Sequence, residues 1–227
     1  MRDNEQGRVI RLEEYHPPAY LVDDVQLDFD LFGDHSRVDA VLRLRRNPDP
    51  QAPREDCTLN GVGLTIEVLE ADGMVLAPDA YQYDGERLVI TNSPDSFVLH
   101  SSVIIHPHNN TALEGLYVSR EMFCTQCEAE GFRRITFYPD RPDVLSKFTT
   151  TVRADKASYP LLLSNGNPIG RGEDGDRHWV RWQDPFAKPC YLFALVAGDL
   201  SCYEDSFTTC SGRQVTLQIF AEQKDLD

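Results

Sequence analysis

The sequence predicts an all-β domain of many mostly antiparallel strands, with at most one or two short helices. Three observations indicate this fold class. Apolar residues alternate with polar ones along much of the chain, as they do in strands that bury one face. Asp-Gly pairs recur at 72–73, 84–85 and 174–175, where they suit the positive φ of tight hairpin turns. Segments with helical periodicity are nearly absent.

The first predicted hairpin covers the beginning of the domain. Apolar residues occupy every second position from Val25 to Leu31 and again from Val38 to Leu44. The segment FGDHS between them has the composition of a turn. We therefore expect two antiparallel strands that share one buried face.

Further strand-like segments follow, each rich in apolar, aromatic or β-branched residues and bounded by Gly, Pro or Asn. They cover residues 64–70, 81–92, 96–107, 134–139, 148–154, 159–166, 178–185 and 190–198. The best helix signal is DRPDVLSKF (140–148), in which Asp140 is a potential cap and Pro142 suits a first turn. We expect at most two helical turns there.

The pattern changes near residue 199. Residues 206–222 predict a separate hairpin about Ser211 and Gly212, and the polar residues after it add no closing element. We therefore expect a β-domain over residues 1–199, with residues 200–227 forming the first strands of a following domain that is truncated here.

Charge and composition disfavour several function classes. The 227 residues carry a net charge of −15, which repels the phosphates of nucleic acids and anionic membrane surfaces. No apolar segment approaches the ~20 residues that span a bilayer, and the first residues lack the apolar core of a secretory signal. Six cysteines are too few for a disulfide scaffold, so we expect a reduced, cytoplasmic protein.

Cys124 and Cys127 form a C-x-x-C pair, which raises the possibility of a metal or redox site. A structural zinc site needs four ligands, and the sequence has no second C-x-x-C and no H-E-x-x-H. A redox pair belongs to a βαβ unit, which the pattern does not contain. We therefore expect no metal and no catalytic residue in this chain, with a metal or redox protein kept as an alternative.

Glu128 and Glu130 follow the C-x-x-C pair and would share one face if residues 125–137 formed a regular strand. Cys127 would then point to the opposite face. Spacing alone leaves two explanations open for Glu128. Either it makes a structural ion pair with Arg133 or Arg134, or it binds a cationic group of a ligand.

Four segments carry a resemblance to a known family. They are NTALEGLY (110–117), FCTQCEAEGFRRITFYPDRPDVLSKFTT (123–150), LLLSNGN (161–167) and HWVRWQDPFAKPCYLFALVAGDL (178–200). In this order they resemble the amino-terminal domain of bacterial aminopeptidase N, a gluzincin zinc metallopeptidase. The resemblance implies a saddle-like β-domain that precedes a thermolysin-like catalytic domain. The catalytic domain's H-E-x-x-H and G-A-M-E-N motifs are missing from this sequence.

The resemblance also assigns roles to single residues. In this family a glutamate of a Q-x-E segment binds the α-amine of the peptide substrate, and that position is Glu128 here. Gln126 matches a residue that lines the pocket for the first side chain. Relatives also suggest a non-proline cis peptide bond next to this glutamate.

The implied partners are the N-terminus of a peptide and the missing catalytic domain. The resemblance places zinc in the full-length enzyme and none in these 227 residues, which we expect to be inactive alone. The alternative is a free-standing β-sandwich binding module without a catalytic role.

Overall fold

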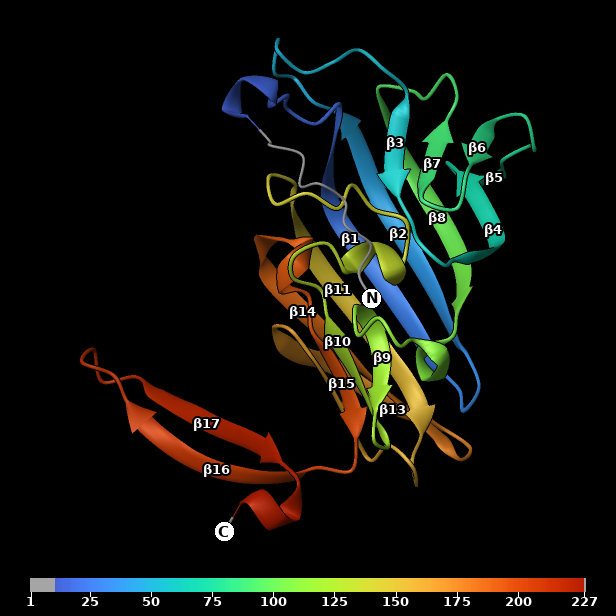
Figure 1. Ribbon diagram of the computed structural model, residues 1–227. Coiled ribbons are helices and arrows are strands. Elements are labelled where there is room, and N and C mark those ends of the chain that lie inside the picture. The colour runs from blue at the N-terminus through green and yellow to red at the C-terminus, as the bar shows by residue number, and fades with distance from the viewer. Residues whose placement is uncertain (1–10, 227) are drawn as a thin grey trace.

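The computed structural model describes residues 11–226 and confirms an all-β fold (Figure 1). In this part of the chain there are 17 strands and five 3-10 helices of three residues each. The helices are η1 (Leu12–Glu14), η2 (Pro107–Asn109), η3 (Phe132–Arg134), η4 (Cys190–Leu192) and η5 (Gln223–Asp225). No helix among the described residues is long and apolar enough to cross a membrane.

The largest sheet has eight strands in the order β13-β14-β11-β1-β2-β8-β4-β5. Its members are β1 (Tyr20–Leu31), β2 (Ser36–Arg46), β4 (Thr65–Ala71), β5 (Met74–Val75), β8 (Ser96–Ile105), β11 (Leu145–Asp155), β13 (Asn167–Asp174) and β14 (Arg177–Pro189). β1 and β11 run parallel, and the other neighbours are antiparallel. The predicted first hairpin is confirmed as β1–β2, in which Val25 pairs with Leu42.

Two smaller sheets lie against the long strands. A three-stranded sheet has the order β3-β7-β6, and a four-stranded sheet has the order β12-β15-β10-β9. Their members are β3 (Cys57–Asn60), β6 (Tyr81–Tyr83), β7 (Arg87–Ile90), β9 (Gly115–Ser119), β10 (Met122–Gln126), β12 (Leu161–Ser164) and β15 (Leu195–Gly198). The three Asp-Gly pairs connect β4 to β5, β6 to β7 and β13 to β14, as predicted, with a φ of 97° at Gly85.

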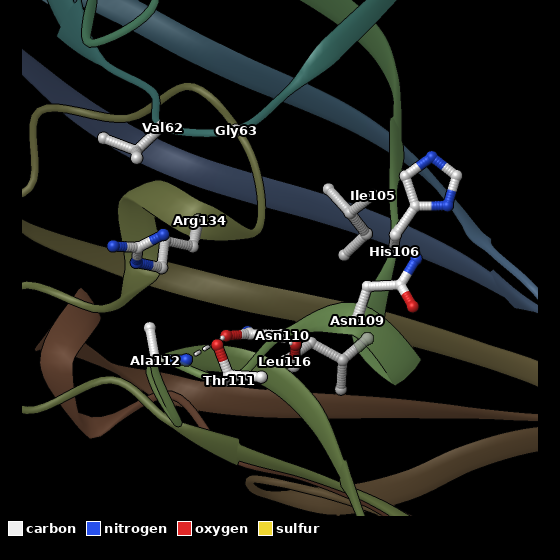
Figure 2. A pocket seen from close by; sticks show the side chains of 10 residues that line it. All are labelled: Val62, Gly63, Ile105, His106, Asn109, Asn110, Thr111, Ala112, Leu116 and Arg134. Carbon is white, nitrogen blue, oxygen red and sulfur yellow. Dashed lines mark hydrogen bonds between the residues drawn. The ribbon is translucent and has the colours of Figure 1, made fainter.

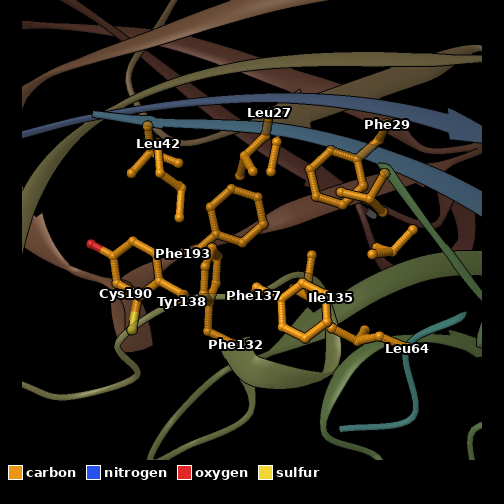
Figure 3. Close-up of a cluster of buried hydrophobic side chains, with 14 of the residues drawn as sticks. Leu27, Phe29, Leu42, Leu64, Phe132, Ile135, Phe137, Tyr138, Cys190 and Phe193 are labelled. Atoms are coloured by element: carbon orange, nitrogen blue, oxygen red, sulfur yellow. The ribbon is translucent and has the colours of Figure 1, made fainter. Parts of the chain in front are cut away.

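The hydrophobic core lies between the large sheet and these shorter elements. Figure 3 shows side chains of the long strands facing side chains of the irregular segment after β10. The labelled residues of the long strands are Leu27, Phe29 and Leu42, and those of the irregular segment are Phe132, Ile135, Phe137 and Tyr138. All seven are at most 2% exposed, so the irregular segment is part of the core.

The strand predicted over residues 125–137 was wrong beyond Gln126. β10 ends at Gln126, residues 128–131 turn, and η3 begins at Phe132. The ring of Phe132 is fully buried, with its centroid 5.1 Å from Tyr138, 6.0 Å from Phe148 and 5.4 Å from Phe193. Burial of this ring draws the chain away from the sheet. Of the strand expected at 134–139, only one bridge, between Asn60 and Tyr138, is formed.

The helix predicted over residues 140–148 was also wrong. Residues 142–143 form a turn, and β11 already begins at Leu145. Asp140, the expected cap, is buried and accepts hydrogen bonds from Arg133 instead of capping a following helix.

The last two strands, β16 (Ser201–Thr208) and β17 (Gln214–Ala221), confirm the predicted terminal hairpin, which projects away from the sheets (Figure 1). One face of the hairpin is mainly apolar and carries four exposed side chains around Asp205, with Tyr203 54%, Phe207 56%, Leu217 44% and Ile219 59% exposed. The opposite face, which includes Glu204, helps to line a cleft of about 1010 Å³. The apolar face has no cover among residues 11–226.

All six cysteines are unpaired, and their burial differs widely. Cys57 and Cys127 are buried, and burial raises the pKa of each thiol to about 12. Cys202 and Cys210 are exposed on the terminal hairpin.

We predict that a disulfide exchange reagent at pH 8 modifies Cys202 and Cys210 rapidly in the folded chain. Cys57 and Cys127 should react only after unfolding, since a thiol with a pKa of about 12 is about 0.01% thiolate at that pH. Mass spectrometry of the labelled peptides measures this order. Rapid native labelling of Cys127 would contradict the buried position.

We also predict that Phe132→Ala lowers the free energy of unfolding by about 3–5 kcal/mol, because a buried aromatic ring is replaced by a cavity. Urea unfolding of the 227-residue chain measures this loss. Phe186→Ala is the matched control, since Phe186 is 78% exposed and should change stability by at most about 0.5 kcal/mol. Equal effects of the two substitutions would show that the core is assigned wrongly.

Candidate functional site

Gln126 and Glu128 lie on the surface at the end of β10. Both are exposed, and the buried side chain of Cys127 lies between them in the sequence. The Gln126 Nε2 atom donates a hydrogen bond to the Glu128 carbonyl oxygen at 3.1 Å. The peptide bond from Glu128 to Ala129 is cis, which confirms the expectation for this position.

The two candidate cationic partners of Glu128 are bound to other carboxylates. Arg133 lies 3.2 Å from Glu130 and 3.0 Å from Asp140, and Arg134 pairs with Glu114 at 3.1 Å. Among residues 11–226, no basic nitrogen lies within 4.0 Å of the Glu128 carboxylate. The local ion pair is therefore made by Glu130, which leaves the Glu128 carboxylate open to a cationic ligand.

Gly131 closes the turn that carries Glu128. Its backbone N–H donates to the Cys127 carbonyl oxygen at 2.8 Å. A Cβ atom at this position would lie 2.3 Å from the Gln126 carbonyl oxygen and 2.9 Å from the Gly115 nitrogen. Only glycine fits so close to the end of β10, so the turn has a fixed place against the sheet.

A buried carboxylate holds the segment after the turn. One Asp140 oxygen accepts from the backbone N–H of Arg133 at 3.1 Å and from its Nε at 3.0 Å. The other oxygen accepts from the Cys190 thiol at 3.0 Å. Burial, and then the charge of Asp140, raise the pKa of that thiol. No local pattern in the sequence indicates this cluster, because Cys190 is distant from Asp140 in the chain.

Two small cavities lie near the turn. One, of about 280 Å³, is lined by residues that include His106, Asn110 and Arg134 (Figure 2). The other, of about 290 Å³, is lined in part by Glu130 and Arg134. Gln126 and Glu128 line neither cavity, so their side chains are presented on the open surface.

The described residues do not fit a metal ion. No group of three or more His, Cys, Asp and Glu side chains in residues 11–226 has the arrangement of a metal site. Cys124 and Cys127 have no third His, Cys, Asp or Glu side chain in reach among these residues, so the C-x-x-C pair offers no complete ligand set. The chemistry available at the turn is therefore the recognition of a cation by a carboxylate.

The sequence matches one protein family over most of its length. The profile of the Peptidase M1 N-terminal domain covers residues 24–192. Aminopeptidase N of Caulobacter vibrioides is 48% identical over 216 residues, which are 95% of this chain and 25% of that protein. Aminopeptidase N of Escherichia coli is 48% identical over 215 residues, 94% of this chain and 24% of that protein. The chain thus spans about a quarter of the length of these relatives.

Solved structures show the same fold. The structure of Legionella pneumophila aminopeptidase A in complex with aspartic acid superposes with a TM-score of 0.91 at 32% identity, and the match covers 96% of this chain and 26% of that one. An M1 zinc metallopeptidase from Deinococcus radiodurans shares the fold alone, with a TM-score of 0.75 at 14% identity over 92% of this chain and 49% of that one. By its profile match and its 48% identity to aminopeptidases N, this chain belongs to the peptidase M1 family, whose N-terminal domain it contains.

Proposed function

We propose that this chain is the N-terminal β-domain of a zinc-dependent aminopeptidase that removes N-terminal amino acids from peptides. Within it, Glu128 binds the α-amine of the substrate. The observation that carries this proposal is the exposed Glu128 carboxylate, which has no cationic partner within residues 11–226 and lies on a tightly held turn. Its place in the Q-x-E segment of an M1 domain supports the same role.

An α-amine is the group that distinguishes the end of a peptide from its middle. It has a pKa near 8, so a large share is protonated at neutral pH. A carboxylate binds this ammonium through charge-assisted hydrogen bonds, which an internal peptide bond cannot supply. Leaving one member of a desolvated charge pair without its partner costs about 3–5 kcal/mol. This difference corresponds to at least about a hundredfold in binding.

Gln126 supports Glu128 from the end of β10. Its side chain donates to the Glu128 carbonyl oxygen and so joins the last strand residue to the turn. We assign its exposed side chain to the wall of the pocket for the first substrate residue. The two residues together would fix the position of the substrate's first residue.

The hydrolytic step is not assigned to this chain, because the described residues hold no metal-ligand cluster. We propose that residues 200–227 begin the catalytic domain, which would hold the zinc ion. The exposed apolar face of the β16–β17 hairpin supports this division, since an isolated two-stranded hairpin is marginally stable in water. The composition favours a cytoplasmic location for the enzyme.

In the complete enzyme, we predict that Glu128→Gln lowers kcat/KM for peptides with a free α-amine by about a hundredfold or more, because the charge pair is lost. Steady-state kinetics measure this loss, and zinc analysis should give the wild-type content. Glu121→Gln is the matched control, since Glu121 is an exposed glutamate at the opposite end of β10. A Glu128→Gln enzyme within about threefold of the wild type would contradict the assigned role.

For the purified 227-residue chain, we predict no turnover of an alanyl chromogenic amide and no stoichiometric zinc, because its described residues lack a metal site. Absorbance at saturating substrate and elemental analysis measure the two quantities. Zinc-dependent turnover by this chain alone would refute the proposed division between the domains.

A further inference from the structure

We propose that Arg133 and Asp140 are positioning residues for Glu128. They would hold the turn in the one arrangement that presents the carboxylate to the substrate amine. This inference rests on the proposed function of Glu128 and adds two residues that do not touch the substrate themselves.

Arg133 joins the surface of the turn to the interior. Its Nη2 atom lies 3.2 Å from the Glu130 carboxylate, while its Nε donates to Asp140 at 3.0 Å. Its carbonyl oxygen accepts from the Val62 backbone N–H at 2.9 Å. The side chain of Arg133 therefore connects the turn to a buried carboxylate, and the backbone of Arg133 connects to the segment after β3.

The planar guanidinium is needed for these contacts. Two of its nitrogens reach Glu130 and Asp140 at the same time. A lysine at position 133 would carry a single ammonium at the end of a flexible stem, which cannot reproduce this forked geometry.

Asp140 fixes the inner end of the connection. Its side chain is only 1% exposed, and Arg133 is the cation that pairs with it in the described part of the chain. The Cys190 thiol donates a hydrogen bond to the second oxygen of Asp140. The backbone N–H of Asp140 donates to Asn60 Oδ1 at 3.1 Å. A buried charge that loses its partner is strongly unfavourable. The loop would therefore rearrange if Arg133 moved away.

A change at Arg133 reaches the turn through its ion pair with Glu130, which lies in the turn two residues after Glu128. Only four residues separate Arg133 from Glu128, and Phe132, one of the four, is buried in the core. Gly131 lies against the Gln126 carbonyl oxygen with no space for even one added carbon atom. A displacement of about 1 Å at a reacting centre can cost on the order of a hundredfold in rate. Small shifts in this segment should therefore weaken catalysis.

A double-mutant cycle in the complete enzyme tests the inference. Arg133→Lys should lower kcat/KM for a free-amine peptide by about tenfold to a hundredfold. The double variant Glu128→Gln/Arg133→Lys should be no slower than Glu128→Gln alone, because no carboxylate remains to be positioned. Arg134→Lys is the matched control, since its charge can keep the surface pair with Glu114, and it should stay within about threefold of the wild type.

Hydrogen exchange gives a second readout that is independent of activity. The amide of Gly131, which donates to the Cys127 carbonyl oxygen, should exchange faster in Arg133→Lys, while the amides of β1 and β2 keep the wild-type rate. If Arg133→Lys does not fold, the same two measurements are made on Asp140→Asn.

The outcomes separate this inference from the proposed function. Three results would each overturn the positioning role and leave Glu128 as the amine-binding residue. They are losses that multiply in the double variant, an unchanged exchange rate of the Gly131 amide, and an Arg133→Lys enzyme with the same kcat/KM as Arg134→Lys. An unaffected Glu128→Gln enzyme would overturn the proposed function and this inference with it.

Discussion

The burial of Phe132 is the constraint on which the position of the site depends. Its ring packs among Tyr138, Phe148 and Phe193, which come from the irregular segment, from β11 and from the end of η4. A chain that places this ring in the core cannot continue β10 as a strand. It turns at residues 128–131 instead, and Glu128 is left on the surface between the buried side chains of Cys127 and Phe132.

The result is an exposed carboxylate on a rigid support. An ion pair exposed to water contributes little free energy of binding. A carboxylate that is enclosed together with its cationic ligand contributes much more. The structure supplies the support through Gly131 and the Arg133–Asp140 pair. On our account the rest of the enzyme supplies the enclosure and the zinc, so amine recognition and hydrolysis come from different parts of one polypeptide.

The regular strands were predictable because period-two alternation and Asp-Gly turns are local signals, and the β1–β2 hairpin follows from them directly. The segment after Gln126 could not be predicted in the same way, because its aromatic and β-branched residues have the composition of a strand, yet they fill the core from an irregular loop. The role of Asp140 depends on Cys190, fifty positions away, which no local pattern reveals. For Glu128, spacing favoured a structural ion pair with Arg133 or Arg134 over a ligand contact, and its assignment depended on the resemblance of the Q-x-E segment to a family.

The most direct test of the central claim is a crystal structure of the complete enzyme with an amino acid or a short peptide bound. The account predicts a Glu128 carboxylate oxygen within about 2.7–3.2 Å of the ligand's α-amine nitrogen. An α-amine held by other carboxylates, with Glu128 facing solvent, would contradict it.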